Sequence, residues 1–545
     1  MRKTLMHLVV GSLLILGTTA CADLDVVNFN DPDAARSLAT PGDVLSLIGG
    51  TYNTWFYGNY SYYSAGLALS NAAFQHTAPW ANSGMEKYGR IPRIAFINSI
   101  SDTDYNYMTR SWFYSYRAIA AVADGLKSLE RDEIKSTLTA DEIASAKAFG
   151  KFVQGMAHAT IAVLFSQGFV VDETTDLTQP QEPSTYTELM AKAGEYFDAA
   201  ATASRGTNWS LPAGWMTVAV TGPELAKIAK SMKARYEAAV ARTPAERAAL
   251  NWTGIMADVD AGITSDVMQY WDMDNGWYND VLDTGTDMGW SQLCYFIFGM
   301  ADQSGNFQTW NAASLTNKSY IIGGKDILIV TPDLRFPQGT TIAAQRLAPT
   351  TYFRVNRPDE AGATWARPDR GTWRWSWYKF NRGGEYYVDL IWDQPEIRLS
   401  EMRLLKAEGL YRTGNKAGAA AIINETRVAA GLNATDAAGT NTSCVPKLPG
   451  PGQGADTAPG NNQCGGLFEM LKWEKRMENT HKGPLGNLWF FDGRGWGDLW
   501  KDTFLQLPMP CSEAQVLQLL PCESFGGPGG QGGAALSTYK WNGES

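Results

Sequence analysis

The sequence predicts a mostly α fold: a tetratricopeptide-like helical-repeat scaffold, a large loop-rich insertion and a few short strands. In residues 41–243 and 396–500, apolar residues recur at the three- and four-residue spacing of amphipathic helices. In residues 244–395, by contrast, Gly, Asp, Asn and aromatic residues interrupt this pattern. The chain has 545 residues, 44% of them apolar, which is enough for an extensive core.

Residues 1–20 at the N-terminus are predicted to be a secretory signal. Residues 1–3 carry positive charge, residues 8–16 are apolar, and small residues precede Cys21. Small residues directly before a cysteine resemble a bacterial lipobox, in which Cys21 is lipidated and anchors the chain. The alternative is an ordinary cleaved signal followed by a cysteine that occurs there by chance. We expect residues 21–545 to form a single domain without a membrane span.

Helical stretches follow one another in the first half of the chain. Thr139 has the position of an N-cap, with Asp141 and Glu142 in the first turn of the helix it begins. The expected helices cover residues 104–130, 139–166, 184–204 and 222–243.

A helix pair is expected over residues 396–431. The first helix ends at Gly414, and Asn415 caps the second, which ends at Gly431. Small side chains on both helices allow a close approach, as in helical repeats. Glu401, Glu408, Asn424 and Arg427 are expected to be structural. A further helix is expected over residues 467–480.

The insertion contains strand-like runs at residues 327–330 and 373–391. The stretch TWRWSWYKF places Trp373, Trp375 and Trp377 on one face of a strand, because side chains alternate with period two. The face is either a sugar-stacking platform or part of the core. Because the run leads directly into the helix at 396, we favour the core.

Other aromatic residues are better candidates for binding a ligand. They stand among Gly, Asn and Asp, whose polar groups would lose water if they were buried. Exposed rings of this kind can stack on the faces of pyranoses, while Asn and Asp bind the hydroxyl groups. The predicted ligand-binding residues are Trp80, Trp271, Trp277, Tyr278, Trp290 and Trp310.

Five cysteines remain after Cys21, and disulfides are expected in an exported chain. Cys444 and Cys464 flank a loop rich in Gly and Pro, and Cys511 and Cys522 lie close together in the sequence. We expect these two pairs to form disulfides and Cys294 to stay outside them. The spacing fits neither a zinc site nor a redox motif.

The composition limits the possible partners. A net charge of -10 argues against nucleic acid, whose phosphates require basic patches. Asp272, Asp274 and Gly276 do not have the spacing of an EF-hand, although a looser calcium site that includes Asp280 stays open. We expect no cofactor. Without a basic cluster, a neutral polysaccharide is the first expectation for the ligand and a peptide the second.

Several stretches together resemble the SusD/RagB family of surface nutrient-binding lipoproteins. They are spread over most of the chain and follow the order found in that family. The C-terminal residues 508–525 follow the family pattern only loosely. The matching stretches are CADLDVVNFNDP (21–32), SWFYSYRAIAAVADGL (111–126), YKFNRGGEYYVDLIWDQPEIRLSEMRLLKAEGLYRTGN (378–415), INETRVAAGL (423–432) and LKWEKRMENTHKGPLGNLWFFDGRGWGDLW (471–500).

The resemblance implies a non-catalytic binding protein, anchored by lipid to the outer membrane and facing outward. It implies delivery of oligosaccharide or peptide to a TonB-dependent transporter. A surface glycoside hydrolase is the alternative, since such an enzyme needs only two carboxylates across a cleft. The acidic residues that could serve are Asp272, Asp280, Asp283 and Asp287.

Overall fold

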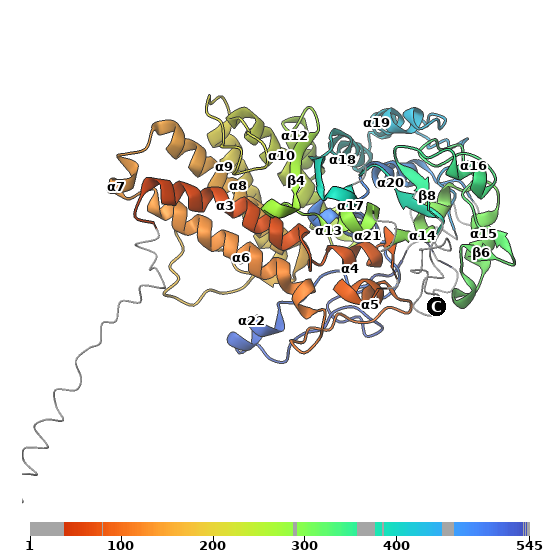
Figure 1. Ribbon diagram of the computed structural model, residues 1–545, viewed down its shortest axis with the longest axis horizontal. Coiled ribbons are helices and arrows are strands. Elements are labelled where there is room, and N and C mark those ends of the chain that lie inside the picture. The colour runs from red at the N-terminus through yellow and green to blue at the C-terminus, as the bar shows by residue number, and fades with distance from the viewer. Residues whose placement is uncertain are drawn as a thin grey trace, which may run out of the picture.

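The computed structural model describes residues 38–78, 80–286, 291–356, 376–383, 386–449, 463–537, 539 and 541. Within these residues helices dominate and strands are short, which confirms the predicted fold class (Figure 1). None of the helices in these ranges is long and apolar enough to cross a membrane. The predicted signal and Cys21 lie outside the described residues.

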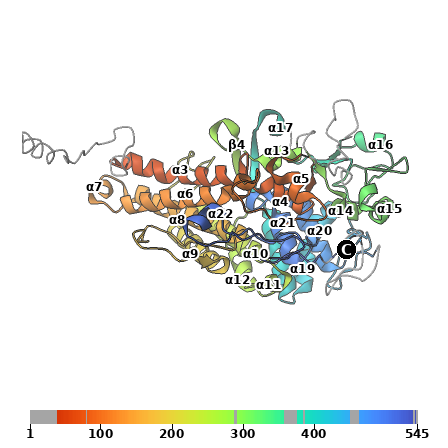
Figure 2. The same cartoon turned by 90° about the horizontal axis from the view of Figure 1, so that it is seen from below.

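The first half of the chain is a stack of helices. Successive helices pack on one another, from α3 with α6, through α8, α9 and α10, to α12 (Figures 1 and 2). Their bounds are α3 Pro41–Tyr60, α4 Gly66–Ala72, α5 Met85–Gly89, α6 Tyr105–Ser128, α7 Asp132–Lys135, α8 Ala140–Leu164, α9 Tyr186–Ser204, α10 Gly222–Ala239, α11 Pro244–Ala248 and α12 Trp252–Asp260.

The second half joins this stack where α18 packs on α12. Short helices and two-stranded sheets fill the intervening region. The remaining helices are α13 Asp280–Thr286, α14 Tyr295–Phe298, α15 Asn306–Ala312, α16 Ile342–Arg346, α17 Tyr386–Asp389, α18 Leu399–Arg412, α19 Lys416–Ala429, α20 Leu467–Glu478, α21 Leu488–Trp496 and α22 Cys511–Val516.

The strands form antiparallel pairs. The longest pair, β4 with β10, brings residues 267–272 beside residues 391–397 at the junction of the two halves. The pairs are β1 His76–Thr77 with β5 Gln292–Leu293, β2 Gln167–Gly168 with β3 Ser184–Thr185, β4 Val267–Asp272 with β10 Ile391–Ile397, β6 Ile321–Ile322 with β7 Lys325–Asp326, and β8 Phe353–Val355 with β9 Tyr378–Phe380.

Capping boxes fix where several long helices begin. The Thr139 hydroxyl accepts a hydrogen bond from the Glu142 N–H, and the Glu142 carboxylate accepts one from the Thr139 N–H. The reciprocal bonds satisfy donors that would otherwise be orphaned at the helix end. The predicted N-cap is therefore confirmed, and Thr40, Thr185 and Thr221 begin α3, α9 and α10 in the same way.

Helices α3 and α6 lie side by side and run in opposite directions (Figures 1 and 2). Gly58 of α3 faces Tyr114 of α6 so closely that a Cβ at Gly58 would lie 2.0 Å from the Tyr114 Cβ. Near the other end, a Cβ at Gly125 would lie 2.5 Å from the Ile48 Cγ1. These glycines therefore set the distance between the two helices.

The predicted helix pair is present as α18 and α19. Gly414 and Gly431 have φ values of +90° and +76°, a conformation that favours glycine, and the Asn415 side chain caps α19. Glu401 and Glu408 are buried in ion pairs with Arg235 and Arg247. Their predicted structural role is confirmed.

The strand predictions for the insertion hold only in part. Residues 327–330 are irregular, because their backbone bonds to separate partners: Ile327 N–H to Tyr320 O and Ile329 N–H to the Tyr378 hydroxyl. Trp377 is buried and donates to Tyr320 O, in agreement with the core interpretation. Trp373 and Trp375 lie outside the described residues.

The proposed disulfides are both present. Cys444 bonds to Cys464 and Cys511 to Cys522, while Cys294 is buried and belongs to neither bond. The second disulfide closes the loop that contains α22.

Candidate functional site

Most of the predicted ligand-binding rings are buried. Trp271, Trp277, Tyr278 and Trp310 are each at most 8% exposed. The expectation that their polar neighbours keep these rings exposed is therefore wrong. Trp80 is half-buried, and Trp290 lies outside the described residues.

Three of these rings meet at the C-terminal end of α3. The centroids of Trp271 and Trp277 lie 6.2 and 5.0 Å from that of Phe56, and Tyr278 lies 4.2 Å from Tyr62. Trp310 packs elsewhere, on Phe296 and Phe307. The structure thus brings Trp271, Trp277 and Tyr278 together in the core at the end of α3, and Tyr278 supports the surface there by packing on Tyr62.

Two tyrosines that the sequence analysis missed form that surface. Tyr62 and Tyr63 follow the end of α3 and are 39% and 53% exposed. Tyr63 stacks on Tyr107 of α6, with centroids 4.9 Å apart and an interplanar angle of 13°. Tyrosines in a turn directly after a helix are the sequence signal that could have identified them. We call Tyr62, Tyr63 and Tyr107 the tyrosine platform.

The backbone holds Tyr63 in an unusual conformation. Its φ of +71° lies in the left-handed region, which a bulky residue rarely adopts. The Tyr63 N–H donates to the Asp280 carboxylate, which opposes this strain. Such strain persists only where the surroundings determine it, and it clusters at functional sites.

A carboxylate pair lies beside the platform on α13. The Tyr278 hydroxyl lies 3.3 Å from Asp280 Oδ1 and 2.5 Å from Asp283 Oδ2. Burial, followed by the charge of Asp283, raises the pKa of Asp280 to about 7. Burial, followed by the two aspartates, also raises the pKa of Tyr278, so its phenol stays protonated and donates. Asp283 is half-buried, so its carboxylate lies at the edge of the platform as a hydrogen-bond acceptor for a ligand.

Trp80 belongs to the same neighbourhood. It packs on a small apolar cluster that includes Leu67, Met85 and Val281. Val281 follows Asp280 on α13, so this short helix carries both the carboxylate pair and one residue of the cluster on which Trp80 packs. Trp80 is therefore the predicted residue that the structure places at the site while leaving its ring partly accessible.

The open alternative of a calcium site finds no support in the described part of the chain. Asp272 instead binds the Asp274 N–H and the Asn275 side chain, within its own turn. The structure also joins His76 and His481, distant in sequence, with their Nε2 atoms 2.5 Å apart. Within the described ranges, neither set belongs to a group of three or more His, Cys, Asp or Glu side chains that could hold a metal ion.

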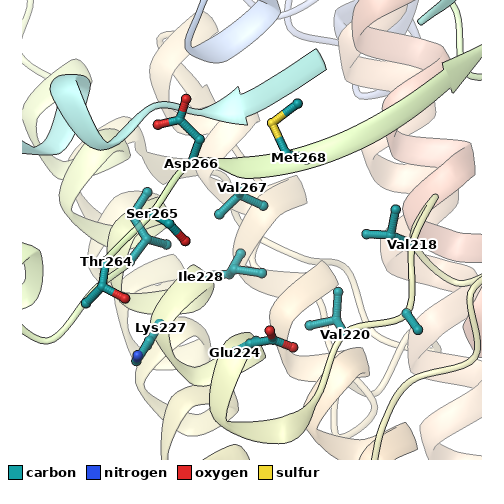
Figure 3. A pocket seen from close by; sticks show the side chains of 12 residues that line it. Val218, Val220, Glu224, Lys227, Ile228, Thr264, Ser265, Asp266, Val267 and Met268 are labelled. Atoms are coloured by element: carbon teal, nitrogen blue, oxygen red, sulfur yellow. The ribbon is translucent and has the colours of Figure 1, made fainter. Parts of the chain in front are cut away.

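A separate cavity of about 300 Å³ lies between residues 218–220, α10 and β4 (Figure 3). None of its lining residues is aromatic. The Glu224 carboxylate at its edge is bound within the Thr221 capping box, and Asp266 accepts a hydrogen bond from the Leu399 N–H. The cavity therefore offers no ring on which a sugar could stack, which favours the tyrosine platform as the ligand site.

The platform combines flat apolar faces with hydrogen-bond acceptors. Tyr62 and Tyr63 present ring surface, and Asp283 lies at its edge. This pairing of apolar surface with a few fixed polar groups suits a ligand such as a sugar. Asp280 and Asp283 bind the same phenol instead of facing each other across a cleft, so the pair lacks the arrangement of a glycoside hydrolase.

The fold of this chain is similar to that of several solved structures. A SusD homolog from Parabacteroides distasonis ATCC 8503 aligns over 87% of this chain and 93% of its own, with 13% identity and a TM-score of 0.54. A SusD superfamily protein from Bacteroides vulgatus ATCC 8482 aligns over 84% and 88%, with 16% identity and a TM-score of 0.48. A laminarin-binding SusD-like protein aligns over 87% and 97%, with 12% identity and a TM-score of 0.48.

No protein-family model matches the sequence, and no curated protein is detectably similar to it. The likeness therefore concerns the three-dimensional fold, which covers most of both chains despite low identity. On this basis the chain has a SusD/RagB-type fold.

Proposed function

We propose that this protein is a non-catalytic binder that captures a glycan on the tyrosine platform. The observation that carries the proposal is the exposed pair Tyr62 and Tyr63 beside Asp283, supported by the buried ring of Tyr278. Stacking on the exposed rings would hold the apolar faces of sugar residues, and the carboxylate would accept hydrogen bonds from their hydroxyl groups. Trp80, which packs on the cluster that contains Val281 of α13, would add a partly accessible aromatic ring.

We further propose that Cys21 carries the lipid anchor, that the protein faces outward from the outer membrane, and that it delivers its ligand to a TonB-dependent transporter. The lipobox-like sequence and the SusD/RagB-type fold support this. Replacing Cys21 with Ala should prevent incorporation of an alkyne-labelled fatty acid and release the protein from the membrane fraction. Label that persists in the variant would contradict the anchor. Co-purification of a transporter barrel from detergent-solubilised membranes tests the partner.

The binding proposal is tested by native electrophoresis through gels that contain defined polysaccharides. The chain from residue 22 onward is compared with the double variant Tyr62→Ala/Tyr63→Ala. Tyr270→Ala is the matched control, because Tyr270 is 42% exposed on β4, outside the platform. We expect at least one gel to retard the wild type and the control, and the platform variant to bind at least tenfold more weakly.

The same samples are assayed for released reducing sugar. Retardation without release supports a binder. Release that depends on Asp283 would contradict the non-catalytic proposal. Retardation that the platform variant retains would contradict the site, and no retardation in any gel would contradict glycan binding and favour a peptide ligand.

A further inference from the structure

Helix α6 carries a stripe of alternating tyrosine and arginine that begins at the platform. Tyr107, Arg110, Tyr114 and Arg117 are three or four residues apart, so they share one face of the helix. Ten residues of helix span about 15 Å. Tyr57 of α3, 39% exposed, borders this face. We call these five residues the Tyr–Arg stripe.

Ring and guanidinium contacts hold the stripe together. The Arg110 guanidinium lies 4.7 Å from the Tyr57 ring centroid and 4.5 Å from that of Tyr114. The Arg117 guanidinium, one turn further along α6, lies 4.8 Å from the centroid of the same Tyr114 ring. Tyr57 and Tyr114 are themselves 5.6 Å apart, because Gly58 lets Tyr114 approach α3 closely. Stacking orders each guanidinium, which would otherwise be free to rotate.

Neither arginine has a carboxylate partner among the described residues. Buried arginines elsewhere bind carboxylates, as Arg235 does, or backbone carbonyl groups, as Arg494 does. In Arg110 the buried Nε and Nη2 atoms have no hydrogen-bond acceptor. Because these two atoms are enclosed, an oxyanion at the stripe would bind the remaining amino group of Arg110 and the exposed guanidinium of Arg117.

Charge complementarity identifies the ligand that would bind there. The chain as a whole carries a net charge of -10, but the stripe itself carries the positive charge of two arginines that lie against rings. Guanidinium groups bind planar oxyanions through paired N–H donors, and the interleaved tyrosines offer sugar-stacking surface between them. The sequence pattern concealed this, because each arginine stands singly among aromatic residues.

We infer that the Tyr–Arg stripe binds the acidic groups of an anionic polysaccharide, either uronate carboxylates or sulfate esters. The inference rests on the proposed glycan binding and names its ligand class. The stripe continues the platform, since Tyr107 stacks on Tyr63 at one end. A bound chain therefore runs from the platform along α6, with its acidic groups at Arg110 and Arg117. This replaces a neutral polysaccharide as the expected ligand.

The test uses native gels that contain polygalacturonate, a sulfated galactan or neutral dextran. Wild type is compared with Arg110→Gln/Arg117→Gln, with Arg117→Gln alone, and with the matched control Arg205→Gln. Arg205 is an exposed arginine at the end of α9, far along the chain from the stripe. Unfolding temperatures confirm that each variant is folded. Because Arg117 is exposed, its single variant reports on the stripe even if the double variant does not fold.

We expect wild type and Arg205→Gln to be retarded by polygalacturonate, by the sulfated galactan or by both, and the double variant to bind at least tenfold more weakly. The two acidic gels distinguish carboxylate from sulfate. Raising NaCl from 50 to 500 mM should weaken wild-type binding more than that of the double variant. Equal binding by wild type and the double variant would overturn the inference.

Failure of the inference and failure of the proposed function give different results. Retardation by neutral dextran alone, lost in Tyr62→Ala/Tyr63→Ala, leaves the glycan platform standing and overturns the anionic ligand. Absence of retardation in all gels overturns both. Binding to an acidic gel that requires the arginines supports both.

Discussion

At the residue scale, the buried carboxyl of Asp280 makes stability depend on pH in a definite direction. Its pKa rises from 3.8 to about 7 on folding, through burial and the neighbouring charge of Asp283. The folded state therefore holds a proton between those pH values that the unfolded state has released. By linkage, this group's contribution to the free energy of unfolding falls as pH rises from about 4 to about 7.

Replacing Asp280 with Asn removes the titration while keeping an oxygen acceptor for Tyr278 and the Tyr63 N–H. We expect the variant to gain stability relative to wild type as pH rises through this range, and the difference to level off above about pH 7. Urea unfolding at unit steps from pH 4 to 8 measures it. Parallel stability curves for the two proteins would show that Asp280 does not titrate as inferred.

Side-chain exposure was the property least accessible to sequence reasoning. Trp271 is buried because it packs near Phe56, more than 200 residues earlier in the chain, and nothing in its own polar neighbourhood indicates that partner. Tyr62 and Tyr63 are exposed in a turn that the distant Asp280 binds through the Tyr63 N–H. Tertiary contacts decide both cases, and the local sequence does not contain them.

At the scale of elements, local sequence signals predicted where helices begin and end better than they predicted side-chain exposure. The Thr139 cap, the stops at Gly414 and Gly431 and the Asn415 cap depend on hydrogen bonds within a few residues, so the sequence predicted them correctly. Residues 327–330 were predicted as a strand because they are apolar. A strand also needs a partner edge, and the backbone there instead bonds to separate groups.

The α3–α6 contact offers a prediction at this scale, because it positions both the platform and the Tyr–Arg stripe. In Gly58→Ala the new Cβ would lie 2.0 Å from the Tyr114 Cβ, so the helices must separate. We expect the free energy of unfolding to fall by about 1–3 kcal/mol, as in other overpacked contacts. The displaced Tyr114 should also weaken binding to acidic glycans. Chemical denaturation and the native gels measure the two effects.

Gly50 provides the control within the same helix. No atom lies within 4 Å of a Cβ added there. Because Ala is the better helix former, Gly50→Ala should raise stability by up to about 1 kcal/mol. Equal effects of the two substitutions would show that helix propensity, and not the close approach to α6, determines the result.

At the scale of the whole molecule, buried ion pairs join the two halves of the chain. Arg247 of α11 binds Glu408 of α18 at 2.7 Å and Asp492 of α21 at 2.8 Å, with all three side chains almost fully enclosed. Trp496 Nε1–H also donates to Glu408. This network therefore adds to the packing of α18 on α12 in holding α3–α12 to α18–α21.

Burial alone would raise the pKa of Glu408, but the charge and hydrogen bonds of Arg247 lower it overall. A carboxylate with a lowered pKa contributes stability above its ordinary pKa of 4.5, and that contribution is lost as pH falls below this value. In Glu408→Gln, Arg247 loses the carboxylate that neutralises it most directly. We therefore expect a loss of about 3–5 kcal/mol at pH 7, measured by urea unfolding.

The exposed pair Arg403–Glu425, on the neighbouring α18 and α19, is the control. Glu425→Gln should cost no more than about 1 kcal/mol, because water screens that pair. The double variant Arg247→Met/Glu408→Met removes both charges of the pair. Because Arg247 is then no longer a buried charge without Glu408, we expect the double variant to be more stable than Glu408→Gln alone. A double variant no more stable than the single one would mean that the ion pair itself, and not the unpaired arginine, accounts for the loss.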